Sequence, residues 1–288
     1  MLRTISAALA RALIGFAPLL LLASLGTKTL AQPATDALTV SIVPQFPAAR
    51  IHAEWQPILD RLSATTGLRF SLAFEETIPA FERAFLEGKH DLVFMNPYHA
   101  VMARRAQGYE PLLRDQTPLT GILVVRKDSG IRSLADLAGQ QIAYPAPNAF
   151  GASLYMRALL ASEPGLVTHP VYVETHGNVY RRVAIGDFVA GGGVNQTLAD
   201  SAPDLRATLR VLYETPPAAS HPLCAHPRVP ADVRRSVQEA LIGLRGDASG
   251  RLLLSTARIP VPVAADYARD YQPLESLGLE AEAPQALR

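Results

Sequence analysis

The chain has 288 residues, of which 49% are hydrophobic and 18% are charged. This composition predicts one large folded domain or two domains of about 100 to 150 residues, and it excludes disordered and collagen-like chains. The 27 Lys and Arg residues nearly balance the 26 Asp and Glu residues without forming a basic run, so we expect binding neither to nucleic acid nor to an anionic membrane surface.

The first 31 residues have the pattern of a secretory signal peptide. Arg3 and Arg11 precede an apolar stretch at 12–25, and residues 29–31 (Thr-Leu-Ala) offer small side chains where a signal peptidase cleaves. The apolar stretch is short for a membrane span, and no other segment approaches eighteen apolar residues. We therefore expect a signal peptide at 1–31 and a periplasmic mature chain; an uncleaved membrane anchor is the alternative.

The next part of the chain alternates between strand-like and helix-like segments. Short apolar and β-branched runs predict strands, and apolar residues three and four positions apart predict helices. The expected strands are 38–43, 68–74, 91–95, 109–113 and 121–125, and the expected helices are 55–62, 81–85 and a third that begins near 98.

A second block follows with the same alternation. Its expected strands are 141–144, 171–174, 188–194 and 209–213, and its expected helices are a short one capped by Ser133, then 154–159, 178–185 and 233–244. The segment beyond Ser255 is rich in proline and predicts no clear element. Strands separated by helices predict an α/β fold with parallel sheets, in which ligands bind at the carboxyl ends of the strands.

The two blocks predict two lobes with two chain crossings, near 120–125 and near 212–222. We expect residues 32–120 to form the first part of lobe 1, residues 121–212 to form lobe 2, and residues 213–288 to return to lobe 1 and form the C-terminal tail.

Sequence motifs of enzymes and cofactors are absent. The chain contains no G-x-S-x-G, H-E-x-x-H, Walker or G-x-G-x-x-G motif, so we expect neither catalysis nor a cofactor. His221, Cys224 and His226 have side chains that suit a soft transition metal. Because prolines flank them on a connection between lobes, we favour a structural role and expect no metal site.

Five linked segments carry a resemblance to a known family: LTVSIVPQFP, WQPILDRLSATTGLRF, DLVFMNPYHAVMA, LVVRKDSGIRSLADLAGQQIAYPAP and VETHGNVYRRVAIGDFVAGGGV. Over residues 38–245 the chain resembles the phosphate/phosphite/phosphonate-type substrate-binding proteins of ABC transporters. The resemblance implies a type II periplasmic binding protein fold, with one small oxyanion held between two lobes that close about a hinge.

The resemblance also implies a membrane permease as partner and a monomeric protein. A periplasmic sensor that reports its ligand to a membrane kinase is the alternative, because one fold can serve both roles. A hydrolase on the same scaffold is a third possibility, which turnover of phosphoesters would reveal.

His176 is the strongest candidate for a ligand contact. The family has a histidine just ahead of a helix that contacts the oxyanion, and the spacing back from Val183 and Gly186 aligns His176 with it. Independently, a helix that begins near Asn178 would turn free N–H groups towards the ligand, and a histidine there would add a donor or a charge. A histidine satisfied by the local backbone is the alternative.

The family often has a loop rich in Ser and Thr ahead of a lobe 2 helix. Here the corresponding residues are Asn148, Ala149 and Phe150, which carry no hydroxyl group. Backbone donors of this loop would still bind an anion. We therefore expect the best ligand to carry an apolar substituent that suits Phe150, rather than to be inorganic phosphate.

Five further candidates have weaker support. An aromatic residue of the family aligns with Ala100, and we expect neighbouring Tyr98 or His99 to replace it unless both simply pack at the helix start. Asn195 stands where the family often has an acid. The remaining candidates, Gln45 and Phe46, follow the first strand.

Overall fold

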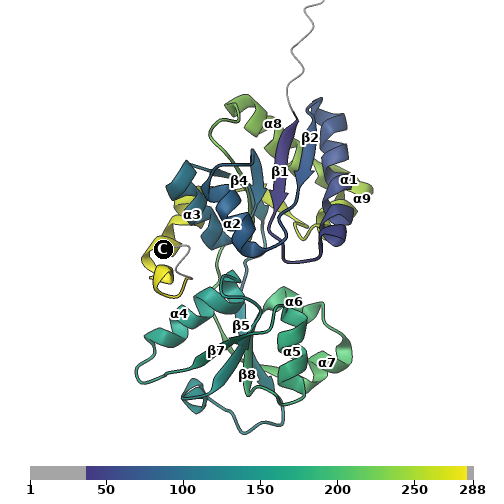
Figure 1. The fold of residues 1–288 in the computed structure, drawn as a ribbon. Coiled ribbons are helices and arrows are strands. Elements are labelled where there is room, and N and C mark those ends of the chain that lie inside the picture. The colour runs from purple at the N-terminus through teal and green to yellow at the C-terminus, as the bar shows by residue number, and fades with distance from the viewer. Residues whose placement is uncertain (1–36, 284–288) are drawn as a thin grey trace, which may run out of the picture. The chain divides into compact units, whose positions relative to one another are not determined.

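The computed structural model describes residues 37–283, so the predicted signal peptide lies outside the described residues. Two mixed sheets form two lobes (Figure 1). Lobe 1 contains six strands in the order β11-β4-β10-β3-β1-β2, and lobe 2 contains five strands in the order β7-β6-β8-β5-β9. This arrangement confirms the predicted α/β fold.

The strands of lobe 1 are β1 (Leu38–Ile42), β2 (Phe70–Ala73), β3 (Leu92–Phe94), β4 (Glu110–Asp115), β10 (Pro222–Ala225) and β11 (Pro262–Ala264). Its main helices are α1 (Ala48–Thr66), α2 (Ile78–Leu86), α3 (Pro97–Gln107), α8 (Ala231–Gly243) and α9 (Ala248–Thr256). The strands of lobe 2 are β5 (Gly121–Arg126), β6 (Gln141–Tyr144), β7 (His169–Tyr172), β8 (Ala190–Val194) and β9 (Leu209–Glu214). Its helices are α4 (Tyr155–Ser162), α5 (His176–Ala184), α6 (Asn195–Ala199) and α7 (Pro203–Thr208), with a 3-10 turn at Leu134–Leu137 and a π-helical turn at Phe150–Leu154.

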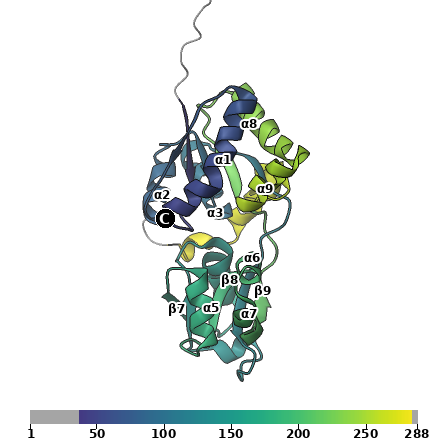
Figure 2. The same ribbon diagram turned by 90° about the vertical axis from the view of Figure 1, so that its right-hand side faces the viewer.

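Both sheets are covered by helices on their two faces. In lobe 1, α1, α8 and α9 cover one face, and α2 and α3 cover the other (Figure 1). In lobe 2, α4 and α5 lie on opposite faces, as the two views show (Figures 1 and 2). Strand β5 is apolar from Ile122 to Val125 because Ile122 and Val124 pack under α5 while Leu123 and Val125 pack under α4. No helix within residues 37–283 has the length and apolar character that crossing a membrane requires.

The expectation of purely parallel sheets is wrong. Strands β1, β2 and β3 are parallel, as are β6, β7 and β8, but β10 is antiparallel to both β3 and β4, and β5 is antiparallel to both β8 and β9. Strand β11 is likewise antiparallel to β4. Of the reversed strands, β5 and β10 are the ones that each sheet receives directly after the chain crosses from the other lobe. A strand that enters in this way needs no helical crossover, so the rule for parallel strands does not apply to it.

The chain passes from the first sheet to the second between β4 and β5 and returns between β9 and β10. These two connections run side by side, because Leu119 and Ala218 exchange backbone hydrogen bonds of 2.9 and 3.0 Å. Strand β9 continues to Glu214, two residues beyond the expected end of lobe 2. The predicted segment boundaries at 120/121 and 212/213 stay predictions.

The segment beyond Ser255 contains more structure than its sequence suggested. It completes α9, adds β11 to the edge of the first sheet, and continues through α10 (Tyr267–Asp270) and two 3-10 turns, Gln272–Ser276 and Leu279–Ala281. The yellow end of the ribbon lies beside α3 (Figure 1). Two buried residues, Tyr271 and Leu279, place this end in the same apolar cluster as residues of α3, and tertiary packing of this kind outweighs weak local propensity.

A close backbone contact in lobe 2 depends on glycine. A Cβ atom at Gly192 in β8 would overlap the carbonyl oxygen of Ala152 and the ring of Tyr144. A Cβ atom at Gly121 in β5 would similarly overlap the carbonyl oxygen of Gly151. The π-helical turn at Phe150–Leu154 therefore lies directly against two strands that present no side chain at the contact.

We expect Gly192→Ala to lower the free energy of unfolding by about 3 kcal/mol, because backbone atoms that cannot rotate away occupy the space of the added methyl group. Urea unfolding followed by circular dichroism measures the change. Gly130→Ala is the matched control, since a Cβ atom there meets nothing within 4 Å. Equal unfolding midpoints for the two variants would contradict the close contact.

Candidate functional site

A cavity lies between the two lobes and is lined by both. Lobe 1 contributes the loop after β1, the inner face of α1, the end of β3 and the two connections between lobes. Lobe 2 contributes the loop and turn at 149–152, the first residue of α5, the end of β8 and the start of α6. The cavity therefore lies at the carboxyl ends of β1, β3 and β8, as expected for an α/β ligand site.

The lobe 1 side of the cavity is mainly aromatic. Phe46, Trp55 and Phe94 line it, and the rings of Trp55 and Phe94 lie 4.8 Å apart. Phe150 lines the cavity from lobe 2 and stacks on Tyr155 at 5.5 Å. An apolar substituent of a ligand would thus meet ring carbon from both lobes.

The turn at 149–152 presents unpaired backbone donors. The N–H groups of Ser153 and Leu154 both donate to the carbonyl oxygen of Ala149, which closes the π-helical turn. Within residues 37–283, the N–H groups of Phe150, Gly151 and Ala152 have no hydrogen-bond acceptor. All three residues line the cavity at the start of the helical segment 150–162, where unpaired donors and the helix dipole favour an anion.

His176 lies in the cavity as the first residue of α5, two positions earlier than the expected helix start. The side chain of Thr175 caps the helix by accepting from the N–H of Asn178 at 3.1 Å. The Nδ1 atom of His176 lies 3.4 Å from the hydroxyl of Thr197 on α6. Shielding from water lowers the pKa of His176 to about 4, so the ring is neutral at neutral pH.

Two charged groups of the cavity wall, Glu54 and Arg258, are paired with each other. Glu54 on α1 accepts from Arg50 at 2.8 Å and from Arg258 at 3.1 Å. Both guanidinium groups lie over the ring of Phe46, with distances of 4.1 and 4.2 Å to its centre. Arg258 is the only Lys or Arg among the described lining residues, and its charge is balanced by Glu54. An anion in the cavity would therefore be met by N–H groups and imidazoles rather than by a free cation.

Of the nine candidate residues, the structure brings five to the cavity. These are Gln45, Phe46, Ala149, Phe150 and His176. Asn195 is exposed outside the lining, and its side-chain oxygen accepts from the N–H of Gln196 at 2.9 Å. Two neighbours of Asn195 on α6, Gln196 and Thr197, line the cavity instead.

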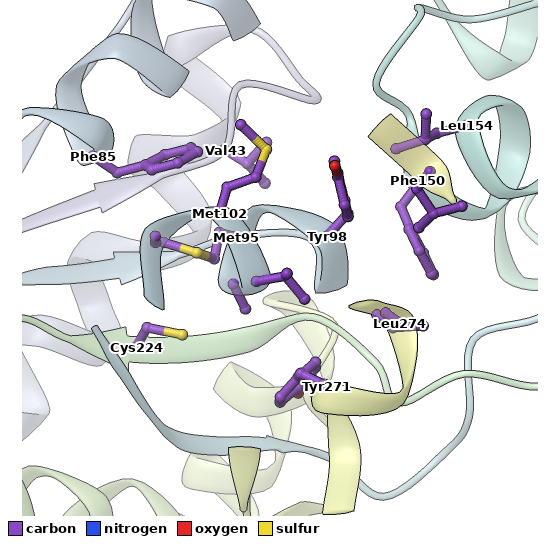
Figure 3. Packing of buried hydrophobic residues seen from close by; sticks show 14 of the residues in the cluster. Val43, Phe85, Met95, Tyr98, Met102, Phe150, Leu154, Cys224, Tyr271 and Leu274 are labelled. Atoms are coloured by element: carbon purple, nitrogen blue, oxygen red, sulfur yellow. The ribbon is translucent and has the colours of Figure 1, made fainter. Parts of the chain in front are cut away.

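The other three candidates are buried outside the cavity lining. Tyr98 belongs to an apolar cluster that also contains Phe150, Leu154 and Leu274 (Figure 3). Burial raises the pKa of Tyr98 to about 12. The Nε2 atom of His99 lies 2.9 Å from a carboxylate oxygen of Glu82. Tyr98 and His99 are thus both buried, which agrees with the alternative that they pack at the helix start.

Asn148 joins the two lobes through hydrogen bonds. Its side-chain NH₂ group donates to Glu82 on α2 at 2.5 Å, and its backbone carbonyl oxygen accepts from the side chain of Asn96, which caps α3, at 3.0 Å. Nearby, Arg157 on α4 holds the carboxylate of Glu282 in the C-terminal segment at 2.7 Å. The lobes thus share polar as well as apolar contacts on the α3–α4 side.

Sequence reasoning missed several lining residues. Trp55 has the helical spacing of a core residue, and its burial is real, but one edge of it also reaches the cavity. Ser220 and His221 lie on the returning connection, and Asp115 and Thr117 on the outgoing one. The sequence could have indicated these residues as cavity-lining only through their position, since both connections pass between the lobes.

The possible metal ligands lie in different surroundings. His221 lines the cavity, Cys224 is buried in β10, and His226 packs edge-on against Tyr109 with ring centres 5.0 Å apart. Burial raises the pKa of the Cys224 thiol. Within residues 37–283, no group of three or more His, Cys, Asp or Glu side chains is arranged to hold a metal ion.

Comparison with known proteins identifies the family. The model for the phosphonate periplasmic substrate-binding proteins of ABC transporters matches residues 40–271, which is most of the chain. The chain belongs to this family. It is the substrate-binding component of a phosphonate-type ABC transporter, and the expectation of no enzymatic activity agrees with a family of binding proteins.

Solved structures share the fold at low sequence identity. A binding protein component of an ABC phosphonate transporter from Pseudomonas aeruginosa is 16% identical, with a TM-score of 0.71 over 84% of this chain and 85% of the other. PhnD1 from Prochlorococcus marinus, in complex with methylphosphonate, is 15% identical, with a TM-score of 0.74 over 86% and 99%. A Xanthomonas citri protein bound to ATP is 17% identical, with a TM-score of 0.72 over 85% and 98%. Together they confirm the type II periplasmic binding protein fold.

The two asparagines expected at the site have different surroundings, which gives a test. We expect Asn148→Ala to lower the free energy of unfolding by about 1 to 3 kcal/mol, because it removes a buried hydrogen bond to Glu82. The matched control, Asn195→Ala, removes an exposed side chain and should change stability by less than about 0.5 kcal/mol. Urea unfolding of both variants measures the difference, and equal losses would contradict the assigned environments.

Proposed function

We propose that the cavity binds one phosphonate-type oxyanion that carries a small apolar substituent. The observation that supports this proposal best is the pairing of two kinds of surface in one cavity. One is formed by unpaired N–H groups at 150–152 and the ring of His176 at the start of α5, and the other by aromatic rings of lobe 1. The first surface suits the oxyanion, and the second suits a substituent.

The oxyanion end would be bound by the N–H groups of Phe150, Gly151 and Ala152 and by the ring of His176. The three N–H groups belong to the backbone and are fixed in position, so they need no reordering when the anion binds. A neutral imidazole donating to an anion forms a charge-assisted hydrogen bond, which contributes about 1.5 to 3 kcal/mol. The absence of a free cation from the described lining makes these groups the main source of affinity for the anion.

The substituent end would lie against Phe46 and Phe94, with Phe150 on the opposite side. The methylphosphonate bound by PhnD1 from Prochlorococcus marinus is a ligand of this class. Residues 148–150 carry no hydroxyl group, so they offer no side-chain hydroxyl donor to the fourth oxygen of inorganic phosphate. This lack would disfavour inorganic phosphate relative to a substituted phosphonate.

We further propose that the lobes move about the paired connections at 116–120 and 215–221, which form the hinge. The two connections are the places where the chain passes between the lobes. The ligand would favour the closed form, because only in that form do both lobes contact it. In this proposal the monomeric mature chain delivers its ligand in the periplasm to a membrane permease.

We expect His176→Ala to weaken methylphosphonate binding by about ten- to a hundredfold, because one charge-assisted hydrogen bond is lost. Isothermal titration calorimetry measures the affinity. His169→Ala is the control, because His169 is an exposed residue of β7 outside the cavity lining. Wild-type affinity in His176→Ala would remove the residue from the site.

We expect methylphosphonate to bind more tightly than inorganic phosphate, and Phe46→Ala to reduce that preference by about fourfold, the effect of about one CH₂ group of buried apolar area. Competition calorimetry with both anions measures the preference. Phe74→Ala, which truncates an exposed phenylalanine outside the lining, should leave the preference unchanged. Inorganic phosphate that outcompetes every substituted phosphonate would overturn the argument for an apolar substituent.

A further inference from the structure

The cavity contains a second histidine, His221, on the lobe 1 side. It follows Ser220 in the returning connection and directly precedes β10 of the first sheet. His176 is the first residue of α5 in lobe 2. The two imidazoles therefore enter one cavity from different lobes, and they are near enough for His176 to act electrostatically on His221.

Neighbouring groups hold the His221 ring in place. Its Nε2 atom lies 3.1 Å from the side-chain nitrogen of Gln45, and its ring stacks on Phe94 with centres 5.9 Å apart and planes 30° apart. Within residues 37–283, the Nδ1 atom of His221 makes no hydrogen bond. One ring nitrogen thus fixes the orientation, and the other is free to bind a ligand.

Nearby carboxylates do not keep either ring protonated. Asp115 accepts from the N–H groups of Thr117 and Val261, both at 2.8 Å, and Glu54 is held by its two arginines. The charged and titratable groups that line the cavity or act on the two rings are Glu54, His99, Asp115, Asp200 and Arg258. None of them forms a hydrogen bond with His176 or His221.

The cavity without an anion therefore disfavours a charge on either ring. Shielding from water, together with repulsion from His99 and His176, lowers the pKa of His221 to about 3. Shielding also lowers the pKa of His176 to about 4. At neutral pH both imidazoles are neutral before a ligand binds.

We propose that His221 contacts the bound oxyanion opposite His176 and takes up one proton from solvent as the anion binds, so that the site becomes cationic only when it is filled. This inference rests on the proposed function and adds to it a second ligand-contacting histidine and a dependence of the affinity on pH. Shielding and repulsion lower the pKa of His221 further than that of His176. The proton is nevertheless assigned to His221, because the ring of His176 lies beside the positive end of the α5 dipole, whereas the Nδ1 atom of His221, unpaired among the described residues, can donate to the anion. No helix begins within two residues of His221.

The direction of the pH effect follows from this linkage. An anion next to His221 raises the pKa of the ring in the complex above its value in the free protein. Proton uptake then occurs at every pH between the two values, and there affinity falls about tenfold for each unit that the pH rises. The protein would therefore bind its ligand more tightly in mildly acidic than in neutral or alkaline surroundings.

Calorimetry with methylphosphonate tests the proposal. Titrations at pH 6, 7 and 8 in buffers with different ionisation enthalpies give the affinity and the number of protons taken up. The variants are His221→Asn and His176→Asn, which keep a polar side chain that cannot be protonated, and the control is His169→Asn on the exposed strand β7. Because methylphosphonate itself titrates in this range, the relevant quantity is the difference in proton count between each variant and the wild type.

We expect His221→Asn to bind about one proton fewer than the wild type at pH 6 and to lose about tenfold of affinity there, with a smaller loss at pH 8. His176→Asn should bind more weakly at every pH but keep the wild-type proton count, and His169→Asn should match the wild type. An unchanged proton count in His221→Asn would overturn the inference while leaving the proposed function intact. Absence of methylphosphonate, phosphite and phosphate binding to the wild type would overturn both.

Discussion

The site depends on the close contact between the turn at 149–154 and strands β5 and β8. Because Gly121 and Gly192 carry no Cβ atom, the backbone of the turn lies directly on the sheet of lobe 2. The π-helical closure at this turn leaves three successive N–H groups without an acceptor among the described residues. Backbone packing in lobe 2 would thus create the proposed anion-binding surface, and the side chains at 148–150 would affect mainly which substituent the ligand carries.

Paired charged side chains form part of the cavity wall, whereas backbone N–H groups would bind the anion. Glu54, Arg50 and Arg258 form a closed group around Phe46, so they contribute to the wall and little to the potential felt by a ligand. Selectivity for an anion would then arise from oriented dipoles rather than from an unpaired cation among the described lining residues. A cavity of this kind attracts oxyanions without the cost of keeping an uncompensated cation away from water.

The sequence predicted the elements better than their pairing. Strands 141–144 and 121–125 match the structure closely, because each is a short apolar run with clear ends. Strand β10 was not predicted, since Pro222 at its start and the short run after it give little local signal. The antiparallel pairings and the return of the C-terminal segment to lobe 1 depend on contacts between distant residues, which periodicity does not contain.

The same limit explains which site residues could be predicted. Candidates with a physical reason of their own, such as His176 at a helix start, lie in the cavity. Tyr98 and His99 were placed by alignment with a family position, but the adjoining cluster of Phe150, Leu154 and Leu274 buries this face of α3.

That apolar cluster also affects how easily the two lobes could separate. Separating the lobes would expose its apolar surface and break the hydrogen bonds of Asn148, so the proposed closed form would have stability of its own even without ligand. A ligand then needs little differential affinity to hold the lobes together, and its release requires that these contacts between the lobes be broken as well.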